Sequence, residues 1–235
     1  MFDLKFFGCG AAFCPAMGNT NAWFAKGSTL YMLDCGESTF EKAVRLVHPE
    51  QYEQIYVLLT HLHADHCGSL ASFCSYMFYK FNKRVRVVHP SENIVTLLSL
   101  QATGRDAYEY YPQLPAEESI RCSFLSVKHA EGMAAFACLL SDEDETVYYS
   151  GDAAELPDAV REDFLSGKIS HIYHDTASHP STFHCWYQLL ADAIPMERRK
   201  DVHCMHLDGD YAALLEELGF SVVHAAEGLR CKVRK

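Results

Sequence analysis

The run Thr60 to His66 constrains this chain more than any other segment, because three histidines and one aspartate fall within six consecutive positions. An isolated histidine is usually a hydrogen-bonded core or surface residue. Four ligand-type side chains in one short loop would repel and desolvate one another unless a cation collected them. A polar loop that is merely rich in histidine is the alternative. The run therefore predicts a metal site, with two ions.

The segment before this run predicts a strand. Gln54 to Leu59 is a short apolar run of strand-forming residues, which is typical of a strand buried on both faces. A chain that leaves a strand keeps roughly two-residue alternation, so His61 and His63 are expected to share one metal. After the turn, Asp65 and His66 are expected to hold a second metal.

This pattern, His-x-His-x-Asp-His after a buried strand, resembles the metallo-β-lactamase superfamily. Further residues resemble the signature positions of that family, appear in the expected order, and each follow a strand-like run. These residues are Asp34, His129, Asp152 and His206. The resemblance implies that Asp34 supports the ligands from behind and that Asp152 bridges both metals. It also implies that His129 completes the first site.

The last ligand has to be chosen between His203 and His206, which lie in one strand-like segment. Strand alternation places Val202, Cys204 and His206 on one face. His206 also stands last before the predicted turn Leu207 to Asp210. We therefore predict that His206 is the ligand.

The resemblance covers essentially the whole chain and implies an α/β fold. That fold is a four-layer αβ/βα sandwich of two mixed β-sheets flanked by helices. A length of 235 residues suffices for a sizeable core, so we expect one domain, residues 1–235. The stretch Ser69 to Asn82 predicts a helix. The acidic segment Ser141 to Glu145 lies between two strand-like runs and predicts a hairpin turn.

Composition indicates a cytoplasmic protein. Its ten cysteines are scattered without Cys-x-x-Cys spacing, so we expect them to be reduced. Met1 to Phe7 predicts a strand rather than a targeting segment. No apolar run approaches the length of a membrane span, so no membrane association is expected.

The ligand set implied by the resemblance is that of a hydrolase. The first ion would be held by His61, His63 and His129, the second by Asp65, His66 and His206, and Asp152 would be shared. Two ions about 3.5–4 Å apart supply a bridging hydroxide as nucleophile. This donor set suits zinc, with manganese, iron and nickel as alternatives. Diiron oxidoreductases of the fold carry glutamate at the place of His63, which favours hydrolysis here.

Two segments resemble the ribonuclease Z and cyclic-nucleotide phosphodiesterase branch of the superfamily. One is Phe6 to Phe13 with Gly18 to Asn21, which looks like the first hairpin of that branch. The other, Ile172 to Ser178, is similar to its His-Glu-Ala-Thr motif. The similarity implies that His174 contacts the phosphate or protonates the leaving oxygen and that Asp175 orients it; a locally bonded strand-end histidine is the alternative. Three residues are therefore catalytic candidates: Asp65, His174 and Asp175.

The substrate is predicted to be a small molecule. The chain has 20 basic and 31 acidic residues and a net charge of −11, which disfavours a large nucleic acid. The interval from His129 to Asp152 also has no room for the long arm of ribonuclease Z enzymes. A small phosphodiester or cyclic nucleotide is the leading hypothesis. The alternatives are a ribonuclease Z-like RNA endonuclease, a lactonase, thioesterase or β-lactamase, and a non-catalytic metal-binding protein.

Two features keep two interpretations each. Thr103 to Pro112 is dense in tyrosine and forms either a lid or dimer contact, or a loop packed on the sheet. His179 and His184 lie close enough in sequence to line one pocket, but His184 also suits an ordinary helix start. A homodimer is expected from the family resemblance alone.

Overall fold

The first half of the chain forms a mixed six-stranded sheet in this computed structural model, which describes residues 2–226. The strand order is β1-β2-β3-β4-β5-β6. The strands from β1 to β3 pair antiparallel, whereas β3 to β6 run parallel. The bounds are β1 Lys5–Phe6, β2 Ala22–Lys26, β3 Thr29–Leu33, β4 Gln54–Leu58, β5 Val85–Val88 and β6 Tyr108–Tyr111.

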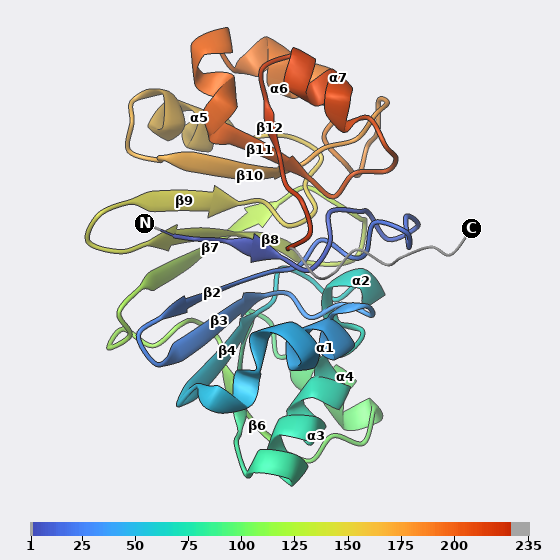
Figure 1. Cartoon of the computed structure of the whole chain (residues 1–235), viewed down its shortest axis with the longest axis vertical. Helices are drawn as coiled ribbons and strands as arrows, with labels where there is room; N and C mark the ends of the chain where they lie inside the picture. Colours follow the sequence, from blue (N-terminus) through green and yellow to red (C-terminus); the bar gives the residue numbers. More distant parts are fainter. Residues whose placement is uncertain (1, 227–235) are drawn as a thin grey trace. The chain divides into compact units, whose positions relative to one another are not determined.

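Helices cover one side of this sheet (Figure 1). Alternation along β3 turns Leu30 and Met32 to the helical side, where they join a buried cluster with Phe73 and Met77 of α3. Packing in this cluster holds the strands of the sheet in place, including the strand that precedes the residue 60–66 loop. The bounds are α1 Thr39–Lys42, a π-helical segment Ala43–Val47, a 3₁₀ turn Pro49–Gln51, α2 Ala64–Cys67, α3 Leu70–Phe81 and α4 Asn93–Leu100.

The second half forms another mixed six-stranded sheet, with the order β12-β11-β10-β9-β8-β7. Strands β7, β8 and β9 pair antiparallel, and β9 to β12 run parallel. Because parallel strands place their carboxyl ends at one edge, residues that follow β9, β10 and β11 are brought together. The bounds are β7 Arg121–Val127, β8 Ala135–Ser141, β9 Thr146–Tyr149, β10 His171–Asp175, β11 Val202–Met205 and β12 Ser221–Val222.

Helices also accompany the second sheet (Figure 1). Phe164 of α5 and Leu190 of α6 are fully buried, as are Ile172 of β10 and Cys204 of β11. The apolar sides of these elements therefore form the core of this half. The bounds are α5 Asp158–Leu165, α6 Tyr187–Ala193, a 3₁₀ segment Met196–Asp201 and α7 Ala212–Glu217.

The chain divides into two compact units, each containing one sheet. Among the described residues, the first, the N-terminal unit, comprises residues 3–113 and 224–226, and the second, the C-terminal unit, comprises residues 2 and 114–223. One domain spanning residues 1–235 stays a prediction. Within residues 2–226, no helix combines the length and the apolar character that a bilayer crossing requires.

Local predictions can be compared with these elements directly. Helix α3 confirms the helix predicted for Ser69 to Asn82, and β8 and β9 confirm the hairpin around Ser141 to Glu145. The tyrosine-rich segment is not a lid loop, because Tyr108–Tyr111 pairs with β5 as an edge strand. Tyr110 donates its hydroxyl to the carbonyl oxygen of His89 at 3.0 Å. This segment therefore packs on its own sheet.

Candidate metal centre

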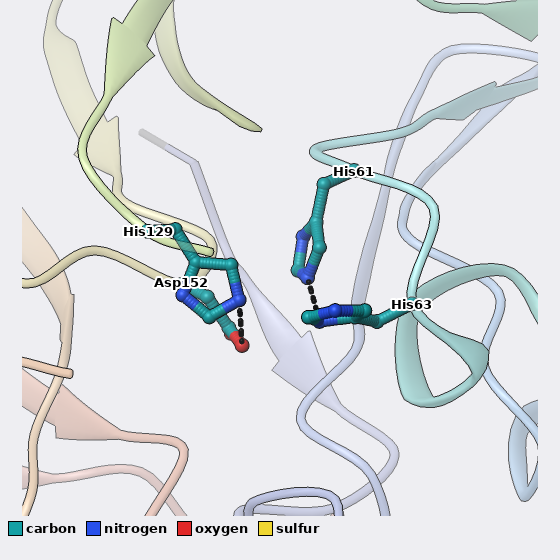
Figure 2. A group of neighbouring side chains, drawn as sticks. All are labelled: His61, His63, His129 and Asp152. Atoms are coloured by element: carbon teal, nitrogen blue, oxygen red, sulfur yellow. Dashed lines mark hydrogen bonds and ion pairs between the residues drawn. The ribbon is translucent and has the colours of Figure 1, made fainter. Parts of the chain in front are cut away.

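His61 and His63 follow strand β4 directly and lie together in the N-terminal unit (Figure 2). The Nε2 atom of His61 is 3.1 Å from the Nδ1 atom of His63. His61 is fully buried. Two imidazole nitrogens that face each other at this distance can bind a common cation, because each can present a lone pair.

The remaining two side chains of this loop lie in the short helix α2. The Nε2 atom of His66 is 3.2 Å from Oδ2 of Asp65, and both residues are buried. Asp34 lies behind them at the end of β3, with its Oδ2 atom 2.8 Å from Nδ1 of His66. The hydroxyl of Thr60 donates to the same Asp34 oxygen at 2.9 Å and lies 3.1 Å from Nδ1 of His61. Asp34 thus orients two histidines of the loop, one directly and one through Thr60.

The amino-terminal stretch also fixes this loop. The side-chain amide of Asn21 donates to the carbonyl oxygen of Asp65 at 3.1 Å and accepts from the backbone N–H of Gly36 at 2.6 Å. A Cβ atom at Gly36 would lie 1.8 Å from the Asp65 carbonyl oxygen, so only glycine permits this approach. Asn21 belongs to the amino-terminal segment that resembles the first hairpin of the ribonuclease Z branch. This segment therefore supports the backbone of the histidine loop.

A second cluster forms within the C-terminal unit, at the ends of its strands. His129 follows β7, Asp152 follows β9 and His206 follows β11. The two carboxylate oxygens of Asp152 face different histidines, with Oδ2 3.5 Å from Nε2 of His129 (Figure 2) and Oδ1 3.3 Å from Nε2 of His206. His206 has a positive φ of 57°, which turns the chain immediately after the strand. The structure places His206 rather than His203 in this cluster.

Asp175 and His184 join this cluster. The Oδ2 atom of Asp175 accepts the backbone N–H of Ala153 at 3.1 Å and lies 2.7 Å from Nδ1 of His184. Its Oδ1 atom is 3.3 Å from Nδ1 of His206. The imidazole rings of His184 and His206 stack with centroids 5.1 Å apart. Ligand-type atoms of Asp152, Asp175, His184 and His206 all lie within 4.8 Å of one another.

The electrostatics of His184 follow from this arrangement. Burial lowers the pKa of His184, but the hydrogen bond that its Nδ1 donates to Asp175 and the charges of Asp175 and Asp152 act in the opposite direction. The net result is a raised pKa for His184. The neighbouring carboxylates therefore favour the protonated form of the His184 imidazole.

His174 lies elsewhere, although it is adjacent to Asp175 in sequence. Alternation along β10 turns its side chain to the opposite face from Asp175. There it is fully buried, with Nδ1 donating to the carbonyl oxygen of Asp175 at 2.7 Å and its ring 6.2 Å from that of Tyr148. Burial lowers the pKa of His174. The structure therefore does not bring His174 to the cluster where the sequence predicted it would act.

The nitrogen contacts of the histidines test whether these clusters suit a metal. The Nδ1 atoms of His61, His66 and His129 each contact an oxygen behind the ring, and their Nε2 atoms face the clusters. Metal-binding histidines typically have this second contact, because it fixes the tautomer and the ring orientation. Imidazole and carboxylate are also preferred ligands of divalent transition metals. The His and Asp clusters therefore fit divalent metal ions.

From the sequence, His174 was the preferred catalytic histidine and His184 a weaker candidate. In the structure, His184 lies in the C-terminal cluster and His174 does not. His184 comes nine positions after Asp175, and no sequence motif joins the two residues. The loop between β10 and α6 brings it back to the carboxylate, since the backbone N–H of Ala177 donates to the Cys185 carbonyl oxygen at 2.7 Å and closes the base of the loop. The sequence suggested that His179 and His184 could line one pocket, but the structure places only His184 in the cluster, and Nδ1 of the exposed His179 lies 3.1 Å from Asp208.

Comparisons with solved structures confirm the fold class. The metallo-β-lactamase fold protein YhfI from Bacillus subtilis superimposes with a TM-score of 0.74 at 16% identity, over 95% of each chain. The short form of human tRNase Z gives a TM-score of 0.68 at 17% identity, over 94% of this chain and 95% of that one. Two mixed sheets with flanking helices match the predicted αβ/βα sandwich fold.

Comparisons of sequence give the family. The model of the anti-Pycsar protein Apyc1 family matches residues 2–224. The anti-Pycsar protein Apyc1 of Paenibacillus xerothermodurans is 23% identical over 235 residues, which cover 92% of both chains. Family, fold and the His and Asp clusters together fit a metal-dependent hydrolase. The chain thus belongs to the family of the anti-Pycsar protein Apyc1, within the metallo-β-lactamase fold.

Proposed function

We propose that this protein is a dinuclear metal-dependent phosphodiesterase that acts on a small phosphodiester or cyclic nucleotide. In this proposal the first ion is held by His61 and His63 of the N-terminal unit together with His129 of the C-terminal unit. The second ion is held by Asp65, His66 and His206, and Asp152 is shared. Zinc is the proposed metal, because imidazole and carboxylate ligands suit it.

The single observation that carries the proposal is the Asp175–His184 pair beside Asp152 and His206. The 2.7 Å contact between Asp175 and Nδ1 of His184 fixes the imidazole orientation, so Nε2 is the nitrogen available to a substrate. Hydrolysis of a phosphodiester expels an alkoxide, which gains from a positioned proton donor by typically ~10²–10⁴ in rate. We therefore assign the general-acid role to His184, with Asp175 as its positioning residue, in place of His174.

Divalent ions in the two clusters would supply an activated water and neutralise phosphate oxygens. The protein itself orients the histidines that would bind these ions. Asp34 and Thr60 orient the histidines of the residue 61–66 loop. The backbone carbonyl oxygen of Phe183 orients His129 at 2.9 Å. This preorganisation keeps the ligands in place before a substrate arrives.

The basic residues of the chain support a small substrate. Lys83 binds the carbonyl oxygens of Glu50 and Tyr52, and Arg86 binds side chains of its own sheet. Arg199 bonds the carbonyl oxygens of Ala191, Ile194 and Leu218. The contacts of these three side chains lie within the fold, which supports the proposal of a small substrate over a long RNA.

Family membership supports a further part of the proposal. Relatives of this chain carry the name anti-Pycsar protein, and we propose that this protein shares the role for which they are named. Homodimeric assembly and a cytoplasmic location complete the proposal. Mass measurement in solution and fractionation of the producing cell test these last two points.

The decisive experiment is an assay of the metal-loaded protein on four substrate classes. We expect hydrolysis of bis-p-nitrophenyl phosphate and of at least one cyclic nucleotide, and no comparable turnover of lactone, thioester or β-lactam substrates. Turnover confined to one of the latter three would replace the phosphodiesterase assignment by a carbon-centred hydrolase. No turnover with both metals bound would leave a metal-binding protein.

A further inference from the structure

Phe183 occupies an unusual position beside the C-terminal cluster. It lies in the loop between β10 and α6, immediately before His184, and 47% of its surface is exposed. By contrast, Tyr149 and Tyr173, at the carboxyl-terminal parts of β9 and β10, are buried. An exposed phenyl ring next to a group of charged and polar ligands is therefore a distinct feature of this loop.

The loop that carries Phe183 is held by several contacts. The backbone N–H of Ala177 donates to the carbonyl oxygen of Cys185, and that of Tyr187 donates to the Ala177 carbonyl at 3.0 Å, which together close the base of the loop. Within the loop, the hydroxyl of Ser181 accepts the backbone N–H groups of Phe183 at 3.1 Å and His184 at 3.2 Å. The exposure of the phenyl ring is therefore a property of a defined backbone.

Phe183 also contacts His129, a member of the C-terminal cluster. Its carbonyl oxygen accepts Nδ1–H of His129 at 2.9 Å, and its ring lies 6.4 Å from the His129 ring at 78°. The ring of His129 is in turn 5.3 Å from that of His184. The phenyl ring is therefore fixed next to both the proposed ligand and the proposed proton donor.

We infer that Phe183 is the surface on which the base of a nucleotide substrate stacks. This inference rests on the proposed function and narrows it to phosphodiesters that carry a nucleobase. A phosphate at the cluster places its attached group within reach of neighbouring side chains. An exposed aromatic ring can stack on any nucleobase, because every base has a π-face. Phe183 then determines specificity without taking part in the chemical step.

The test measures binding, so it does not depend on turnover. Metal-loaded protein is titrated in a calorimeter with a 3′,5′-cyclic nucleoside phosphorothioate, and with 1-O-methylribose 3′,5′-cyclic phosphate, which has no base. Phe183→Ala should weaken binding of the first ligand about 5- to 150-fold, the range for loss of one stacked base. Binding of the base-free ligand should change by less than about twofold, since no stacked base is lost.

Three further variants make the result specific. Leu189→Ala removes an equally exposed apolar side chain, 47%, from α6 of the same unit and should leave both affinities unchanged. Phe183→Trp should retain the affinity for the nucleotide. Phe183→Leu keeps the apolar bulk without the π-face, should behave like Phe183→Ala, and carries the same test if the alanine variant unfolds.

Each outcome separates the inference from the proposed function. Equal weakening of both ligands by Phe183→Ala would show a structural role of the loop and overturn the inference, as would unchanged nucleotide affinity. Wild-type protein that binds neither ligand would overturn it too. Selective loss of nucleotide binding supports the inference even if the wild-type protein hydrolyses no diester, in which case only the phosphodiesterase assignment fails.

Discussion

The two ligand clusters are built in different ways. In the N-terminal unit, one loop of six residues after β4 supplies His61, His63, Asp65 and His66. In the C-terminal unit, His129, Asp152, Asp175, His184 and His206 come from five separate places in the chain. The first cluster depends on the conformation of one loop, whereas the second depends on the register of several parallel strands.

This difference determines how each cluster is supported. Asp34, at the end of the neighbouring strand, contacts His66 directly and reaches His61 through Thr60. The C-terminal cluster instead uses its own members, since Asp175 contacts both His184 and His206. We therefore expect Asp34 to be important for the loop cluster. In the C-terminal cluster, we expect the loss of a shared carboxylate to be the most damaging change.

The largest expected effect is that of Asp152→Ala. Because both oxygens of Asp152 face histidines, its loss should lower the content of both metals and reduce kcat/KM by about 10³-fold or more. Asp65→Ala should lower the content of one metal only. Elemental analysis of the purified variants checks this difference, and retention of both metals in Asp152→Ala would contradict the shared-ligand assignment.

Replacement of His184 tests the proton donor. His184→Ala should lower kcat by about 10²–10³-fold with unchanged metal content, because it removes a general acid and not a required ligand. His179→Ala is the control, since that side chain is 71% exposed on the same loop. Steady-state kinetics with elemental analysis decide the matter, and loss of metal would make His184 a ligand.

His174 provides the matching test within the same strand. His174→Ala removes a fully buried side chain on the other face of β10, so it should lower the free energy of unfolding by about 1–3 kcal/mol. Its kcat should remain within about threefold of wild type, because no catalytic proton transfer is lost. A fall in kcat as large as that of His184→Ala, without destabilisation, would restore the role predicted from sequence.

Asp34→Asn should weaken metal binding by the N-terminal cluster. Asparagine tolerates the positive φ of 67° at this position, but its amide nitrogen would face the donors Thr60 and His66. We expect a decrease of about 10–100-fold in metal affinity, measured by competition with a chelator. Asp3→Asn, at an exposed position, is the control. Unchanged affinity would show that Asp34 does not orient the ligands.

The smallest expected effect concerns the strand that precedes His206. Burial, assisted by His171, lowers the pKa of His203 to about 4 from the usual 6.5. The unfolded chain therefore binds a proton more readily, so this contribution to stability is present above pH 6.5 and is lost as the pH falls toward 4. Between pH 7 and 5 we expect a loss of about 1–2 kcal/mol, and a shallower dependence in His203→Gln, by denaturant unfolding. Equal slopes would exclude His203 as the cause.

Much of the loop cluster could be predicted from sequence, because its members are consecutive. The buried strand Gln54–Leu58 and the run after it indicate both the place and the chemistry of the ligands. Helix α3 could be placed for the same reason, since its apolar pattern is local. His184 could not be ranked in this way. Its partner Asp175 is nine positions away, and only the closed loop between β10 and α6 joins them.

The amino-acid sequence alone indicated the residue 61–66 ligands and the acidic balance, because these depend on residue type and short-range spacing. The fold family was implied by the resemblance of the sequence motifs to the metallo-β-lactamase superfamily. The tertiary structure decided that Asp175 faces the cluster while His174 points to the opposite side. It also decided that His184 and the exposed ring of Phe183 lie beside His129. The physical reason is that a side chain one position along a strand is turned to the other face, and that loop closure sets which distant residues meet.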